Sequence, residues 1–229
     1  MNVPTTILPK IRNVIVTAVD MSKTGQLPVD LGISIVRVVK GFLVSAIVGV
    51  VLGSAMGMSE TTKELLLPTI TTIRQIPMIA WIPLIILWAG IGEASKVIII
   101  VIAAVFPILV NTMSGITGTP KGYVEVAKLY KLGRWQTFTK VFLPHALPQM
   151  LVGLKLGLGV SWMAVVASEL IAATSGIGYR MNEARSLMRS DKVIVCMIVI
   201  GIVGILMDKV ISVIFEKITP WIQINEKKA

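Results

Sequence analysis

Five blocks of apolar residues, long and almost free of charge, constrain the fold of this sequence more than any other feature. They cover residues 34–58, 76–89, 97–112, 150–173 and 193–215. A helix of about 20 apolar residues crosses the hydrocarbon core of a bilayer. Only 15% of the residues are charged, against about 25% in soluble domains. The sequence therefore predicts an all-α integral membrane protein with five transmembrane helices.

The order of polar and apolar parts predicts three regions. Residues 1–33 form an N-terminal segment, residues 34–216 the transmembrane domain, and residues 217–229 a C-terminal tail. One long polar segment, residues 115–149, separates the third and fourth blocks. Five crossings would put this segment on the same side as the C-terminus and opposite the N-terminus. Lys and Arg are divided almost equally between the two sides, so the positive-inside rule leaves the orientation open.

The N-terminal segment has helical periodicity. Ile11, Ile15 and Val19 recur every four residues, before Gly25 and Pro28 interrupt the pattern. Apolar residues at this spacing, beside basic residues, predict an amphipathic helix that lies on the membrane surface.

The chain carries a net charge of +10. In a membrane protein, this excess of Lys and Arg favours contact with the anionic headgroups of membrane lipids. No basic patch with interleaved aromatic residues is present, so nucleic acid is not an expected partner. The sequence has a single cysteine, Cys196, which has no second cysteine for a disulfide, and a single histidine, His145, which has no cluster of further metal ligands. We interpret both as structural.

The long polar segment has the pattern of two short helices. We expect the first over residues 120–131 and the second over residues 134–142, with Gly133 between them and Pro144 ending the second. Apolar side chains share one face of each helix: Tyr123, Val126 and Tyr130 on the first, and Trp135, Phe138 and Phe142 on the second. Such a face needs a protein partner or folds back on the bilayer, and the pattern alone leaves both open.

Glycines recur at four-residue spacing in two of the apolar blocks. The positions are Gly49, Gly53 and Gly57 in the first block and Gly153 and Gly157 in the fourth. Small residues at this spacing let two helices approach closely. Packing within the chain is the first interpretation, and contact with a second copy is the alternative.

Two charged residues lie inside the fourth block. Lys155 and Glu169 are about 21 Å apart along one helix, so they cannot pair with each other. We expect Lys155 to extend toward a membrane face. Glu169 precedes a glycine-containing turn at residues 175–178, and we expect it to line the outer mouth of a solute pathway.

The segment from Glu125 to Pro144 resembles the EAA loop of ABC importer permeases. The positions that match in register are Glu125, Ala127, Leu143 and Pro144. Lys131 stands where the family has a glycine, and Gly133 follows two residues later, so the corner between the helices is expected to shift. In the family this loop is the coupling helix, which docks on a cytoplasmic ATPase.

Three further segments, residues 74–93, 168–179 and 22–42, resemble permeases that import nitrate, sulfonates or taurine. The resemblance covers residues 4–225. Members of that group usually have one more helix before this region, so we leave open whether a first transmembrane helix is missing here. The resemblance implies a multi-pass protein of a bacterial or archaeal cell membrane, with the N-terminus outside and residues 115–149 and the C-terminus in the cytoplasm.

The resemblance also implies partners. They are a separate ABC ATPase subunit, an extracytoplasmic substrate-binding protein and a second permease copy in a homodimer. The chain has no Gly-x-x-x-x-Gly-Lys-Ser/Thr loop, so the ATPase would bind the ATP, and we expect no cofactor in this chain. No nucleophile, metal or carboxylate constellation predicts an enzyme. The expected function is import of a small solute, an anion such as a sulfonate, taurine or nitrate.

Two sets of residues carry this hypothesis. The set that couples to the ATPase is Glu125, Ala127, Lys131, Gly133, Trp135, Phe138, Phe142, Leu143 and Pro144. The set expected along the pathway is Trp81, Pro83, Asn111, Ser161, Glu169 and Ser175. A stand-alone secondary transporter or channel is the alternative, although the internal repeat that many such folds have is not evident.

Overall fold

The computed structural model describes residues 9–219, and every regular element in that part of the chain is a helix. Residues 220–229, most of the predicted C-terminal tail, and residues 1–8 lie outside the described residues. The elements are α1 (Ile11–Lys23), α2 (Gln26–Met58), α3 (Glu60–Gln75), α4 (Met78–Ala89), α5 (Glu93–Thr117), α6 (Lys121–Leu129), α7 (Arg134–Thr137), the π-helical segment η1 (Phe138–Phe142), α8 (Leu143–Ala172), α9 (Ile177–Ser186) and α10 (Ser190–Ile218). The prediction of an all-α protein is confirmed.

The described residues contain four candidate membrane-spanning helices, or five if α3 and α4 together form one bent span. Four helical segments within residues 9–219 are long and apolar enough to cross a membrane. They are α2, α5, the continuous stretch of α7, η1 and α8, and α10. The predicted second span, 76–89, is the 12-residue helix α4, which reaches only about 18 Å and cannot cross a core of about 30 Å alone. It counts as a crossing only together with α3, from which it is bent by 96°.

Pro77 explains the break between α3 and α4. A residue before proline is disfavoured in the α-helical conformation, and Ile76 has φ −73° and ψ 118°, which is extended. The predicted span 76–89 includes Pro77, which would then lie within a single helix. The structure shows instead that the helix ends before it.

Two other helix boundaries differ from the expected ones. α2 begins at Gln26 rather than near residue 34, because its polar first turns are buried against other helices: Asp30, Ser34 and Arg37 are all enclosed. Pro144 does not end the helix before it, since it lies in the first turn of α8, where proline is tolerated.

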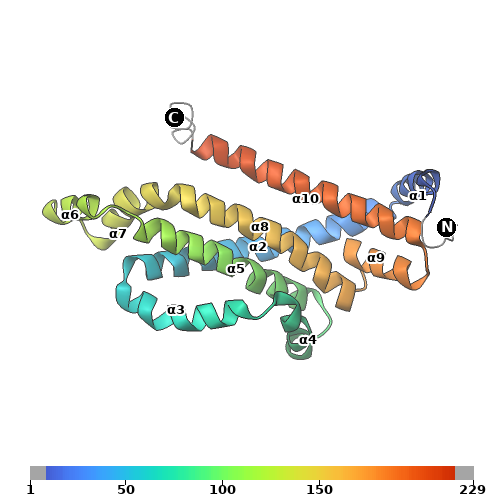
Figure 1. The fold of residues 1–229 in the computed structure, drawn as a ribbon, viewed down its shortest axis with the longest axis horizontal. Helices are drawn as coiled ribbons and strands as arrows, with labels where there is room; N and C mark the ends of the chain where they lie inside the picture. Colours follow the sequence, from blue (N-terminus) through green and yellow to red (C-terminus); the bar gives the residue numbers. More distant parts are fainter. Residues whose placement is uncertain (1–8, 220–229) are drawn as a thin grey trace, which may run out of the picture.

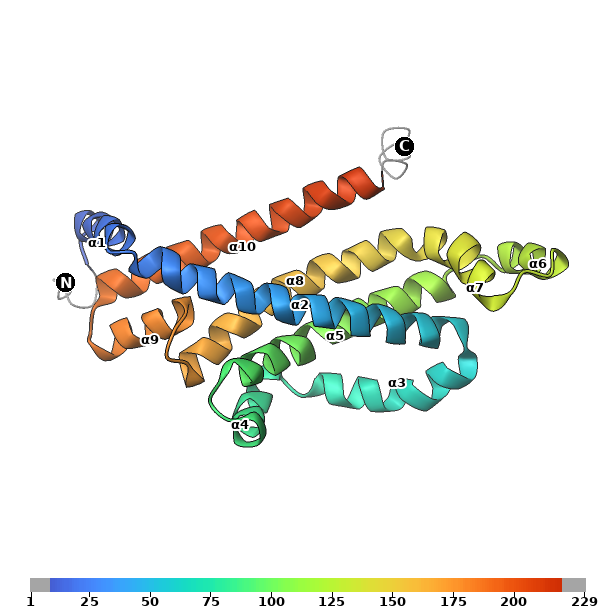
Figure 2. The same cartoon turned by 180° about the vertical axis from the view of Figure 1, so that it is seen from behind.

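Figures 1 and 2 show an elongated molecule with α2, α5 and α8 along its length. α5 packs most extensively on α2 and on α8, and α10 runs beside them. One end carries α6 and α7, and we call it the knob end. The other carries α1, α9 and the start of α10, and we call it the α9 end. The described end of α10 points toward the knob end, and α1 lies at the opposite one.

Glycines let α2 approach α5 closely. A Cβ atom built on Gly49 would lie 2.8 Å from Ile108 Cγ2, and one on Gly53 would lie 2.6 Å from the carbonyl oxygen of Leu109. Gly57 is equally close to Ile116. The stripe expected to be a packing surface therefore faces a helix of the same chain. Gly153 and Gly157 on α8 lie against Asn111 and Ile108 of α5 in the same way.

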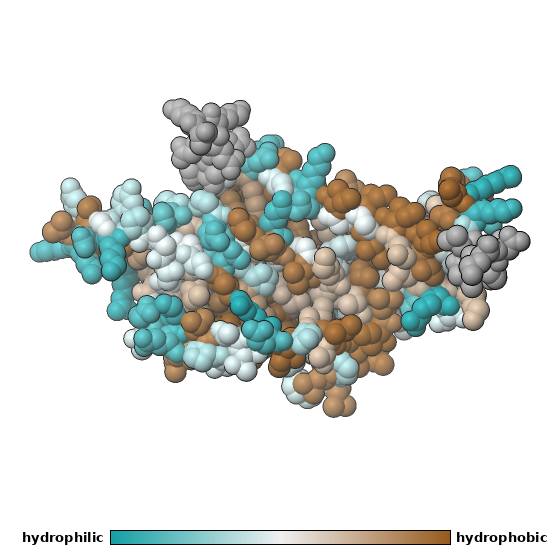
Figure 3. All heavy atoms as spheres, in the orientation of Figure 1, coloured by the Kyte–Doolittle hydropathy of each residue, from teal (hydrophilic) through white to brown (hydrophobic). Residues whose placement is uncertain are grey.

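Apolar side chains cover much of the outer surface. Figure 3 shows hydrophobic residues over the central part of one face and hydrophilic residues gathered around α6 and α7. Ile47 on α2 and Ile205 on α10 are 66% and 69% exposed. Exposed apolar side chains over the middle of long helices are typical of a surface in contact with lipid or another membrane subunit.

Candidate functional site

The helices α6 and α7 form a protruding knob at one end of the molecule (Figure 1). α6 ends in a Schellman motif: the N–H of Leu132 donates to the carbonyl of Ala127 at 3.0 Å, and the N–H of Lys131 donates to the carbonyl of Lys128 at 2.9 Å. Lys131 has φ 51°, the left-handed conformation that this motif requires.

The corner of the knob is therefore at Lys131, and the expected shift to Gly133 is wrong. Gly133 has φ −66° and ψ 163°, an extended conformation that any residue can adopt, and it begins α7. A Cβ atom there would have no neighbour within 4 Å. The left-handed corner thus falls on Lys131, the position where the resemblance led us to expect a glycine.

Much of the apolar surface of the knob is open to solvent. Leu129, Tyr130 and Trp135 are 81%, 78% and 74% exposed, and Tyr123 and Val126 are exposed as well. We call these five residues the knob surface. Ala127 points the other way and is buried. A cluster of exposed aromatic side chains on a polar projection is typical of a protein interface.

The second predicted face divides into two parts. Phe138, Phe142 and Leu143 pack on a small core formed by Ile116, Ala146 and Met150, so they attach the knob to the transmembrane helices. Trp135 stays outside this core, with its ring 5.7 Å from that of Phe138. Phe138 was expected to share an exposed face with Trp135, and the structure corrects that expectation.

The knob surface is framed by basic residues. Lys121, Lys128, Lys131 and Arg134 are exposed around it, and Glu125 is the exposed carboxylate on α6. A partner that covers the knob would therefore need an apolar groove with an acidic rim.

The α9 end holds a buried cluster of charged side chains around Arg37 of α2. The Arg37 Nη1 donates to Glu169 Oε1 at 2.7 Å and to the carbonyl of Ser175 at 2.8 Å. The Arg37 Nε donates to Glu93 Oε2 at 2.8 Å, and Nη2 binds the second oxygen of the same carboxylate. Arg37 thus links α2 to α5, to α8 and to the turn before α9.

Glu169 is fully enclosed by this cluster. Besides Arg37, its carboxylate accepts hydrogen bonds from the Ser34 hydroxyl and, at 3.0 Å, from the N–H of Gly178. Its side chain has no exposed surface. The expectation that Glu169 lines the mouth of a pathway does not agree with this position, because the carboxylate is saturated by partners within the chain.

A second buried carboxylate, Asp30, supports the same turn. It accepts from the N–H of Gly176 at 3.1 Å and from Arg180 Nε at 2.7 Å. Burial alone would lower the pKa of the Arg180 guanidinium, but its hydrogen bonds and ion pairs with Asp30 and Glu183 together outweigh that effect and raise the pKa. Arg180 therefore stays charged. Sequence analysis missed Asp30 and Arg37, although both are charged residues at the start of a long apolar helix.

The remaining predicted pathway residues are not brought together. Trp81 is half-buried and Pro83 is exposed on α4. Asn111 accepts a hydrogen bond from the Gln149 side chain at 2.8 Å, and the buried Ser161 hydroxyl donates to the carbonyl of Gly157. Asn111 and Ser161 thus have partners inside the chain.

Lys155 on α8 has an ion-pair partner that the sequence did not reveal. Its Nζ lies 3.2 Å from Asp208 Oδ2 on α10. Lys155 was expected to extend alone toward a membrane face, and the structure pairs it with the neighbouring helix instead. Asp208 interrupts an apolar run, which is the signal that could have suggested the pairing.

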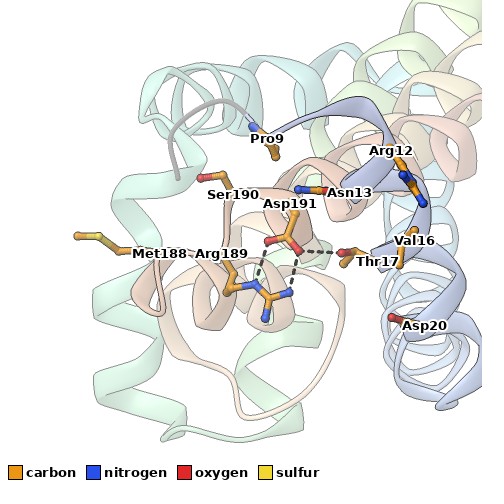
Figure 4. Close-up of a pocket in the computed structure, with 10 residues that line it drawn as sticks. All are labelled: Pro9, Arg12, Asn13, Val16, Thr17, Asp20, Met188, Arg189, Ser190 and Asp191. Atoms are coloured by element: carbon orange, nitrogen blue, oxygen red, sulfur yellow. Dashed lines mark hydrogen bonds and ion pairs between the residues drawn. The ribbon is translucent and has the colours of Figure 1, made fainter. Parts of the chain in front are cut away.

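A polar groove opens between α1 and the start of α10 (Figure 4). Its volume is about 480 Å³, and Arg12, Asp20 and Arg189 are among its lining residues. Asp191 is one of its lining residues. Its carboxylate accepts hydrogen bonds from Thr17 Oγ1 at 2.7 Å and from Nε and Nη2 of Arg189. The groove therefore offers charges of both signs at the end opposite the knob.

The sequence matches the family described as "Binding-protein-dependent transport system inner membrane component" over residues 45–224. It is 41% identical over 199 residues to a protein of Methanocaldococcus jannaschii described as an ABC transporter permease, covering 86% of this chain and 74% of that one.

Two other relatives carry the names of their solutes. The chain is 35% identical to the taurine transport system permease protein TauC of Escherichia coli, covering 83% of this chain and 70% of TauC. It is 34% identical to the nitrate import permease protein NrtB of Synechocystis, covering 85% and 70% of the two chains.

The fold is similar to that of a solved structure, an amino acid ABC transporter crystallised with histidines. The TM-score is 0.67, with 16% sequence identity, and the match covers 86% of this chain and 97% of that one.

Proposed function

The chain belongs to the binding-protein-dependent transport system inner membrane component family, and from this we propose that it is the membrane-spanning permease subunit of an ATP-driven importer. In that role it would supply half of the pathway for a small solute. It would receive the solute from an extracytoplasmic binding protein and would draw energy from a separate ATPase subunit.

The observation that carries this proposal is the knob surface. Trp135, Tyr130 and Leu129 are large apolar side chains that remain exposed on a polar projection. Burying such side chains in a partner releases about 1.5–3 kcal/mol each. The projection is held to the transmembrane helices by Phe138 and Phe142, so a force applied to it would reach α8 directly.

The polarity of the knob favours the cytoplasmic ATPase as its partner. Four exposed Lys and Arg side chains surround the knob surface: Lys121, Lys128, Lys131 and Arg134. An acidic rim on the ATPase would orient docking, and Glu125 would select one basic residue on that rim. By this account the knob end is cytoplasmic.

The α9 end would then face outward and receive the binding protein. The groove between α1 and α10 supports this, because it carries both Arg12 and Asp20 on its lining. Complementary charges on a docked protein would fix its register on such a surface.

The relatives suggest the class of solute. Their names include taurine and nitrate, both of which carry a small oxoanion group. We propose the same class for this chain. The exposed apolar faces of α2 and α10 are available to lipid and to a second copy, with which this chain would complete the pathway as a homodimer.

The knob proposal is tested by Trp135→Ala. Truncating a central interface tryptophan costs about 2 kcal/mol or more, so association with the ATPase should weaken by about 30-fold or more. The control is Trp88→Ala on α4, since Trp88 is 72% exposed and lies away from the knob. Association is measured by co-purification and titration in detergent. Equal ATPase affinity in both variants would mean that the knob surface is not the docking site.

A further inference from the structure

An exposed carboxylate at the α9 end is bound by two buried cations. Glu93, the first residue of α5, has a side chain that is 67% exposed. The Arg37 fork that binds both of its oxygens is 3% exposed. The Lys96 side chain is 5% exposed, and its Nζ donates to the Gly92 carbonyl at 2.9 Å and lies 4.0 Å from Glu93 Oε1. An exposed carboxylate is thus bound by two buried cationic side chains. We call the position between Arg37 and Lys96 the cradle.

The interior of the cluster does not need Glu93 to be complete. Glu169 is satisfied by Ser34, Gly178 and Arg37 Nη1. The other contacts of Arg37 inside the protein go to Ser175. With Glu93 removed, two buried cations would face one buried carboxylate. Arg37 would keep Glu169 and Ser175, and Lys96 would keep the Gly92 carbonyl, but the pair would carry one uncompensated positive charge. Removing one partner of a buried ion pair is destabilising, so the cradle favours a second anion.

Glu93 is placed so that it can leave the cradle. The turn before it contains Gly90, with φ 75°, and Gly92, and a Cβ atom on either would meet no atom within 4 Å. The turn is therefore uncrowded, and the Glu93 side chain next to it is 67% exposed to solvent. The cradle it would vacate faces the surface at the α9 end.

We propose that Arg37 and Lys96 form an oxoanion site, which the Glu93 carboxylate occupies until a solute anion replaces it. The planar Arg fork matches two oxygens of a carboxylate, sulfonate or nitrate group. A single negative charge keeps the cluster neutral, so monoanionic groups are preferred over dianionic ones. A role for this site in transport rests on the proposed function, whereas anion binding by the purified chain does not.

The experiment is anion rescue of Glu93→Ala. In buffer without small oxoanions, the variant should melt about 5 °C below the unmodified chain, because Arg37 and Lys96 lose a partner. Adding methanesulfonate or nitrate should restore most of that loss with a saturable dose dependence. The unmodified chain should respond less, because Glu93 competes for the cradle. If Glu93→Ala does not fold, Glu93→Gln is measured in the same way.

Glu60→Ala is the matched control. Glu60 is also the first residue of a helix, its side chain is 69% exposed, and it pairs with the lysine three residues later, Lys63, at 2.9 Å. It lacks a buried arginine fork. Its variant should show no saturable response to methanesulfonate.

Two further arms identify the source of the anion and the outcome that would overturn the site. If anionic phosphatidylglycerol in nanodiscs, but not zwitterionic lipid, stabilises Glu93→Ala without added solute, the oxoanion comes from a lipid headgroup. The site is disproved if Glu93→Ala and Glu60→Ala respond identically to methanesulfonate and to phosphatidylglycerol. That result would leave the ATPase-docking test of the knob untouched.

Discussion

Lys131 has a backbone conformation that residues with a Cβ atom rarely adopt. Its φ of 51° is left-handed, which costs a residue with a Cβ atom about 1–2 kcal/mol. Lys131→Gly removes this cost but adds freedom to the unfolded chain, so the net effect should be a stabilisation of about 0–1 kcal/mol. Gly133→Ala should be tolerated, since its backbone is extended and its surroundings are open.

Heat denaturation of the two variants in detergent checks this prediction. A loss of stability in Lys131→Gly that exceeds the loss in Gly133→Ala would contradict the assignment of the corner to Lys131. Retained ATPase association in both variants would show that the knob keeps its shape.

Single residues also mark where sequence reasoning reached its limit. The resemblance at Glu125, Ala127, Leu143 and Pro144 located the knob, but sequence similarity does not show which side chains are exposed to solvent. Phe138 and Trp135 are both aromatic and three residues apart, and only packing against Ile116 and Met150 separates their roles. Likewise, the partner of Glu169 lies 132 residues away in Arg37, and no local pattern connects them.

At the scale of the helices, the contact between α2 and α5 depends on small residues. Gly53→Ala would put a Cβ atom 2.6 Å from the carbonyl oxygen of Leu109, so the helices would have to separate, at a cost of about 1–3 kcal/mol. Gly201 on α10 has no neighbour within 4 Å, so Gly201→Ala should stabilise by up to about 1 kcal/mol through helix propensity alone.

The opposite signs of these two changes make the comparison informative. Each kcal/mol should shift the melting temperature by about 2–4 °C in a chain of this size. If Gly53→Ala melts at or above the temperature of Gly201→Ala, the two helices do not need a glycine at their closest approach.

Hydropathy predicted the helix boundaries where the helix ends are apolar. It did not predict them where buried polar side chains have partners within the chain. α5 and α10 were found within a few residues, although α5 begins earlier than expected, at Glu93. α2 extends further because Asp30, Ser34 and Arg37 find partners on α8, α9 and the turn between them. Hydropathy could not predict the break between α3 and α4, because the bend of 96° depends on the backbone conformation at Ile76 and Pro77.

For the whole molecule, the sequence was sufficient for the fold class and the family, because both depend on long-range hydropathy and on one specific loop. It was not sufficient for the pathway. The residues expected along it were chosen for their residue type, and the structure links only Glu169 and Ser175, through Arg37. The others, Trp81, Pro83, Asn111 and Ser161, lie elsewhere. The proposed pathway lies between two copies, so its lining would depend on the dimer and not on one chain alone.

The two ends of the molecule have different chemistry, and this difference is the basis of the functional account. The knob end offers exposed aromatic side chains in a basic frame. The α9 end offers a charged groove and the Arg37 cluster. A permease driven by an ATPase on one side and supplied by a binding protein on the other needs two such unlike ends, whereas a stand-alone transporter or channel does not need the knob.

Uptake by reconstituted liposomes tests that account most directly. The chain is reconstituted alone, or with an ABC ATPase and a binding protein from the same source, and uptake of labelled taurine, an alkanesulfonate and nitrate is measured with and without ATP on the ATPase side. We predict accumulation of at least one of these anions only when all three proteins and ATP are present, and its loss with Trp135→Ala. Uptake by the chain alone, driven by a proton or sodium gradient or by the solute gradient and unchanged by the ATPase, would contradict the importer account and favour a secondary transporter or channel.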